Sequence, residues 1–154
     1  MNNLEGTYCQ YVYRSRMRTD AALCHSSGLE NFTRLKRLKL TFSDEDIRLI
    51  STVLDRVRSK RIKVLTLMLR ADKQPRATTL QQLAELRLDA VLDEPWFRRL
   101  RSVLLCVETR VPRGEELDKV GWVADIKERL PGLQARGILK TVVYGSRYRH
   151  FYPS

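Results

Sequence analysis

This sequence contains few of the side chains that carry out most enzymatic chemistry, and those present are not spaced so that they could act together. Its two histidines are His25 and His150, and Cys24 with His25 is the one place where a thiol and an imidazole are close along the chain. Neighbouring side chains of an extended segment point to opposite faces, so this pair cannot share a proton. No G-x-G segment is present that could hold a phosphate group. We therefore expect no catalytic site, no cofactor and no small-molecule substrate.

Metal ligands and disulfides are not expected either. Cys9, Cys24 and Cys106 are odd in number and lack C-x-x-C spacing, which argues against a zinc site and a disulfide framework. The acidic clusters at 44–46 and 115–116 stand where helices are expected to begin. The helix dipole stabilises carboxylates at that position, so these clusters have a structural explanation and predict no metal site.

The sequence shows no membrane-spanning or secretory segment. No apolar run reaches the roughly 18 residues that cross a bilayer, so no membrane partner is expected. The first residues, 1–6, lack the basic segment and the apolar core of a secretory signal. We expect a cytoplasmic or nuclear protein.

The chain is strongly basic, with a formal net charge of +11 and a pI near 10.0. Such a charge attracts nucleic acid and acidic proteins, although solvated, arginine-rich helix faces would also produce it. Basic residues cluster at 34–39 and 56–63, and arginines alternate with aromatic residues at 147–152. Arginine beside an exposed aromatic ring can combine a phosphate contact with stacking on a base. The candidate residues for RNA or DNA binding are Arg147, Tyr148, Arg149 and Phe151.

Four short segments share one pattern of apolar residues, at relative positions 0, 3 and 5. The last two positions are two residues apart, so both side chains lie on one face of a strand. The segments begin about 27, 38 and 39 residues apart, within the range of repeats that stack along one axis. They are Leu35/Leu38/Leu40, Ile62/Leu65/Leu67, Leu100/Val103/Leu105 and Leu139/Val142/Tyr144.

Apolar residues at helical spacing occupy the three connections between these strands. Ser43 is expected to cap the first helix, which carries an apolar stripe from Ile47 to Val57. Thr78 begins a capping box for the second helix, which should end near Pro95. Helical connections of this length predict a parallel four-stranded α/β sheet in the order β-α-β-α-β-α-β. The expected stripe of the third helix is Leu117, Val120, Val123, Ala124 and Leu130.

Several of these segments resemble a known family. The L-x-x-L-x-L pattern at 35–40 is the strand signature of leucine-rich repeats. LD-x-x-L followed by F-x-x-L-x-x-V at 88–103, and LPGLQARGIL at 130–139, resemble the carboxyl-terminal part of the fungal F-box-like protein family. The resemblance covers about residues 35–144 and implies an irregular leucine-rich-repeat-like solenoid that would meet a ligase substrate. The F-box itself has no counterpart in these residues, and the Asn or Cys of regular repeats is replaced by Ser43, Arg70, Glu108 and Arg147.

The strand face opposite the helices is the candidate partner-binding surface. In an open solenoid this face is concave and receives the partner, and an exposed apolar patch there would mark an interaction site. The alternative is that both faces are covered, as in most parallel sheets, with residues 1–30 packed on the second face. The candidate partner-binding residues are Arg37, Lys39, Val64, Thr66, Met68, Leu104 and Val143.

Three segments follow from this reading of the chain. Residues 1–30 form an irregular or incomplete amino-terminal repeat, residues 31–146 form the α/β repeat domain, and residues 147–154 form a basic, aromatic tail. We expect a non-catalytic protein-interaction module that presents a surface to a protein partner. The alternative is a basic RNA- or DNA-binding domain.

Overall fold

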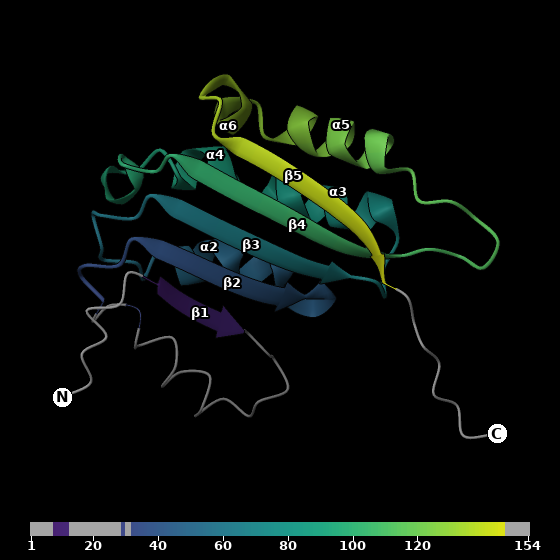
Figure 1. Ribbon diagram of the computed structural model, residues 1–154, viewed down its shortest axis with the longest axis horizontal. Coiled ribbons are helices and arrows are strands. Elements are labelled where there is room, and N and C mark those ends of the chain that lie inside the picture. The colour runs from purple at the N-terminus through teal and green to yellow at the C-terminus, as the bar shows by residue number, and fades with distance from the viewer. Residues whose placement is uncertain (1–7, 13–28, 30–31, 147–154) are drawn as a thin grey trace.

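Five parallel strands form one sheet in the computed structural model, which describes residues 8–12, 29 and 32–146. The strands lie side by side in the order of the sequence, and each neighbouring pair is parallel (Figure 1). The α/β class and the parallel pairing of the four predicted strands are therefore confirmed, and one more strand precedes them. The strands are β1 (Tyr8–Val12), β2 (Arg37–Ser43), β3 (Val64–Ala71), β4 (Ser102–Arg110) and β5 (Leu139–Ser146).

Each connection from β2 onwards contains helical turns, as parallel pairing requires. In the view of Figure 1, α2, α3 and α4 lie behind the strands, and α5 contacts both α3 and β5. In the described ranges, no helical stretch meets the length and hydropathy that crossing a bilayer requires. The helical elements are η2 (Asp44–Leu49), α2 (Ile50–Leu54), α3 (Arg76–Glu85), α4 (Leu88–Val91), η3 (Pro95–Phe97), α5 (Lys119–Arg129) and α6 (Pro131–Ala135).

The core lies between the sheet and the helices. Successive side chains of a strand point to opposite faces, and in β2, β3 and β4 the side chains on the helix side are apolar and buried. Burying a side chain of this kind stabilises the fold by about 1.5–3 kcal/mol. The row of strand residues that forms this floor is Leu38, Leu40, Phe42, Leu65, Leu67, Leu69, Val103, Leu105 and Val107.

A carboxylate joins the two segments on which the family resemblance rests. Both oxygens of Asp89 in α4 accept backbone N–H groups at the start of α6, from Gly132 and Leu133, each at 2.8 Å. The approach is so close that a Cβ at position 132 would lie 2.8 Å from Cγ of Asp89. Position 132 is therefore glycine because any larger side chain would collide with Asp89.

The first two predicted helices are shorter than expected. Ser43 does not cap the first, because its hydroxyl donates to Asp46 instead, and only Ile50–Leu54 is α-helical. The second begins at Arg76, before the predicted capping box, and its Thr79 is buried. This helix ends at the left-handed Arg87, whose φ of 50° separates α3 from α4. Two short helices therefore stand where one was predicted.

The predicted apolar stripe of the third helix is wrong in part. Val120 is 83% exposed, whereas Trp122 and Ile126 are the buried residues of α5. The helix begins at Lys119 because the side chain of Asp118 accepts the N–H of Gly121. Trp122 and Ile126 are four residues apart, so they lie on the same face of the helix.

The predicted register of the last strand is wrong by three residues, and an odd shift exchanges the two faces of a strand. Leu139 pairs with Val103, so Leu139, Thr141 and Val143 lie on the helix face of β5. Val143 is 4% exposed and Val142 is 46% exposed, the reverse of the prediction. The error arose because apolar residues occupy both faces of this strand, and alternation alone could not choose between them.

Candidate interaction surface

The outer face of the sheet carries the candidate surface. We define the outer face as the side chains of β2 to β5 that point away from the helices; no helix in the described part of the chain covers it. Strand pairing places Lys39, Thr66, Leu104 and Lys140 in one row across the sheet. The next row is Thr41, Met68, Cys106 and Val142.

The centre of the outer face is apolar, and its flanks are basic. Met68, Leu104 and Cys106 are half-buried, and Val142 beside them is exposed. The lysines at positions 39 and 140 stand on either side of this centre. Partial burial raises the pKa of the Cys106 thiol, and the nearby Lys39 ammonium opposes that effect. An apolar centre with charged flanks is the composition of a protein-binding surface.

Six of the seven predicted partner-binding residues lie on this face. Of these, Arg37 is exposed and the other five are half-buried. The seventh, Val143, lies on the helix face and contributes to the core; its neighbour Val142 takes the outer position. The predicted nucleic-acid residues of the tail, 147–151, and the histidines lie outside the described residues. The six are Arg37, Lys39, Val64, Thr66, Met68 and Leu104.

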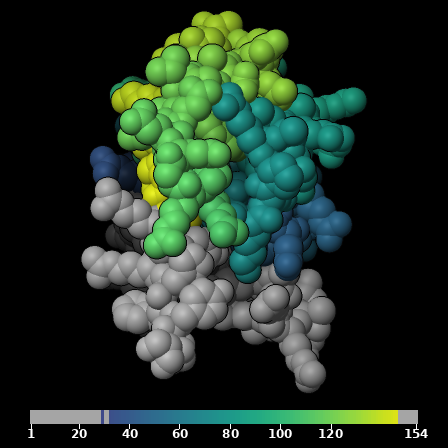
Figure 2. Space-filling model, turned by 90° about the vertical axis from the view of Figure 1, so that its right-hand side faces the viewer, coloured from purple at the N-terminus to yellow at the C-terminus, as the bar shows by residue number. Residues whose placement is uncertain are grey.

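A cleft of about 430 Å³ lies at the carboxyl ends of β3 and β4, between the segments that lead into α3 and α5. Figure 2 faces this end of the molecule and shows the two segments side by side at the surface. In parallel α/β sheets, ligands bind at this end of the strands. The chemistry of its side chains decides whether this cleft is such a site.

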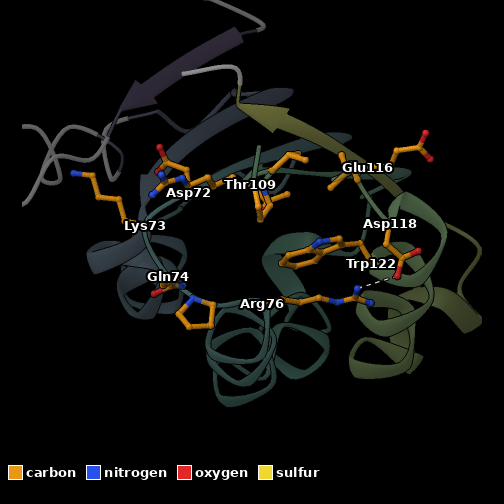
Figure 3. A pocket seen from close by; sticks show the side chains of 13 residues that line it. Asp72, Lys73, Gln74, Arg76, Thr109, Glu116, Asp118 and Trp122 are labelled. Carbon is orange, nitrogen blue, oxygen red and sulfur yellow. Dashed lines mark hydrogen bonds and ion pairs between the residues drawn. The ribbon is translucent and has the colours of Figure 1, made fainter. Parts of the chain in front are cut away.

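The most prominent side chain of the cleft, Arg76, already forms ion pairs within the protein. Its guanidinium pairs with Asp118 at 3.1 Å and with Asp125, and it lies 5.1 Å from the centre of the Trp122 ring (Figure 3). The N–H of Gly121 and then the guanidinium lower the pKa of the Asp118 carboxyl. These contacts tie α3 to α5 and neutralise the arginine. Arg76 therefore has a structural role in this cleft, because it holds α3 against α5.

One carboxylate beside the cleft is buried. Asp44 accepts the backbone N–H of Lys73 at 2.8 Å, and burial raises the pKa of its carboxyl. Among the described residues, no group of three acidic, cysteine or histidine side chains is placed to hold a metal ion. The hydrogen bond from Lys73 to Asp44 joins the loop after β3 to the start of η2.

The structure also gathers basic residues that are distant in sequence. The segments 34–37, 58–63 and 98–101 precede β2, β3 and β4, and they contain ten lysines and arginines and no carboxylate. Because parallel strands begin at the same edge, all three segments meet there, at the left in Figure 1. We call these segments the basic edge. Sequence reasoning noticed the first two and missed the third, although each basic run directly precedes a predicted strand.

No protein-family model, curated protein or solved structure matches this chain.

Proposed function

We propose that this chain is a non-catalytic protein-interaction module that binds an acidic segment of a protein partner on the outer face of its sheet. The observation that carries the proposal is the apolar centre at Met68, Leu104 and Val142, with Lys39 and Lys140 on either side. An apolar side chain of the partner would pack on the centre, and carboxylates around it would meet the lysines. Charged flanks of this kind raise the rate of association, and the apolar centre supplies affinity.

The proposal includes the arrangement implied by the family resemblance. Strands in sequence order, with the helices of successive connections behind them, support an irregular leucine-rich-repeat-like solenoid. In the fungal F-box-like family this region would meet the substrate of a ubiquitin ligase. A ligase substrate is accordingly the kind of partner that we propose for this chain.

Site-specific photocrosslinking tests this proposal. A photoreactive phenylalanine analogue at position 104 should capture one protein in cells, and the same analogue at position 84 should not. Ala84 is the matched control because it is exposed on α3, in the helix layer. The captured protein is then purified and its affinity for the wild-type chain is measured by calorimetry.

The substitution Leu104→Glu should weaken the purified complex by roughly 30-fold or more, because it places a charge at the apolar centre. Ala84→Glu should leave the affinity unchanged. Both variants should keep the wild-type circular dichroism and urea midpoint, which shows that the fold is intact. Equal affinity of the wild type and Leu104→Glu would overturn the proposal, as would equal capture at positions 84 and 104.

A further inference from the structure

Three cations of the basic edge stand in a straight row. The backbone N–H of Lys63 donates to the carbonyl of Lys36 at 2.8 Å, and the N–H of Arg101 donates to the carbonyl of Lys63 at 2.8 Å. These hydrogen bonds place the three residues side by side immediately before adjacent strands, with their backbones about 4.8 Å apart. We call Lys36, Lys63 and Arg101 the cation row. Strand pairing fixes the spacing of the three backbones, and the long side chains carry the charges outward from them.

Nothing in the described part of the chain neutralises this row. Lys36, Lys63 and Arg101 form no ion pair with any described carboxylate. The carboxyl end of a helix attracts cations, but this effect falls off within the last turn. Lys63 lies nine residues beyond the end of α2 at Leu54. Arg101 lies ten residues beyond the end of α4 at Val91 and four residues beyond η3, a single turn that ends at Phe97. Neither residue belongs to the last turn of a helix.

A hollow of about 320 Å³ opens at one end of the cation row. It is lined by Lys36, Arg37, Lys63 and Val64, so three of its four lining residues are cationic. Cations that converge on one hollow repel one another, and an anion in the hollow would remove that repulsion. A phosphate group accepts hydrogen bonds from lysine and arginine together.

The chemistry of the edge favours nucleic acid over the other polyanions. A protein partner needs an apolar centre, and the basic edge is charged at its centre. Binding to a membrane surface is strengthened by exposed apolar side chains that insert, but Trp96 lies under Arg58 and Lys60 at 5.5 and 5.3 Å. Nucleic-acid interfaces are the class that is polar and strongly basic throughout.

We infer that the basic edge binds the phosphate backbone of nucleic acid, with one phosphate in the hollow and the strand running along the cation row. Because the contacts are to phosphates, binding does not depend on base sequence. The hollow shares Arg37 and Val64 with the outer face, but it does not include the apolar centre at Met68, Leu104 and Val142. The inference does not rest on the protein-binding function proposed above.

Fluorescence anisotropy with a labelled oligouridylate tests this inference. The variant Lys36→Ala/Lys63→Ala/Arg101→Ala removes the cation row. The control Arg48→Ala/Arg113→Ala/Lys119→Ala removes three exposed cations elsewhere, and both triple variants lower the formal charge of +11 by three. The wild type should bind at about 50 mM salt and lose most of its affinity by about 200 mM.

The row variant should bind roughly 100-fold more weakly near 0.1 M salt, and its slope of log affinity against log salt should fall by about 2. An oligoadenylate should behave as the oligouridylate does, and the control should change affinity by less than about threefold. Equal losses in the row variant and the control would overturn the inference, because net charge alone would then explain binding. It would also be overturned if the wild type bound phosphatidylserine vesicles or polyglutamate and did not bind the oligonucleotide. Leu104→Glu should leave oligonucleotide binding intact, which separates this result from that of the protein-binding test.

Discussion

The Asp89 carboxylate gives the sharpest test of how α4 and α6 are joined. It lies in α4 and holds the first turn of α6, which is 43 and 44 residues further along the chain. The substitution Asp89→Ala removes both acceptors and leaves the N–H groups of Gly132 and Leu133 without them. The half-buried position of Asp89 means that water can replace the carboxylate in part.

The expected loss follows from this geometry. Removing a helix-capping side chain costs about 0.5–2 kcal/mol, and hydrogen bonds to a charged acceptor stand at the upper end of the usual range. Asp89→Ala removes two hydrogen bonds of 2.8 Å to a half-buried carboxylate, so we expect it to lower the unfolding free energy by about 2 kcal/mol. Asp89→Asn keeps one acceptor oxygen and should lose about 1 kcal/mol.

Urea unfolding followed by circular dichroism measures the loss, with an unchanged slope m as the sign that only stability has changed. The melting temperature should fall by about 4–8 °C for the alanine variant. Asp93→Ala is the control, because Asp93 is exposed two residues beyond α4 and should change stability by less than about 0.5 kcal/mol. If Asp89→Ala were as stable as Asp93→Ala, the capping contact would contribute nothing and the reasoning would be refuted.

Two further predictions concern β5 and the α3–α5 contact. Val143→Asp should lower the unfolding free energy by about 4 kcal/mol, because it buries an unpaired charge. Val142→Asp should lower it by less than about 1 kcal/mol, because position 142 is exposed. If urea unfolding showed the larger loss for Val142→Asp, the register of β5 would be wrong. Arg76→Gln should lower stability at neutral pH. The folded state lowers the pKa of Asp118, so the contribution of the Arg76 pair is complete above the usual pKa of 3.8 and is lost as the pH falls through the lowered value. Urea unfolding of wild type and variant should therefore show a gap that is constant above about pH 5 and narrows towards pH 2, and a gap of constant size would contradict this.

Much of the fold could be predicted because local patterns and the overall topology agree. The apolar triplets beginning at Leu35, Ile62 and Leu100 each precede or enter a strand, and the residues between them form helices. Connections of that length permit parallel pairing, and no short hairpin favours antiparallel pairing, so the strand directions could be predicted from the sequence. Six outer-face residues followed as well, since strands alternate with a period of two.

The errors fell where the sequence allowed two arrangements of similar local quality. In β5, Val142 and Val143 are equally suited to a core position, and pairing with β4 chose the second. In α5, Trp122 is buried and contacts the Arg76 guanidinium from α3, whereas Val120 is exposed. A contact between residues that are distant in sequence has no signature in a short window.

The α/β class, the positions of β2 to β5 and the basic character of the chain follow from composition or from periodicity within a few residues. Which charges lie side by side depends on strand pairing in the folded chain. Lys36, Lys63 and Arg101 are separated by up to 65 residues in the chain, and hydrogen bonds between parallel strands bring them to one edge. The same pairing sets the rows of the outer face, because register is a property of two strands and is absent from either one alone.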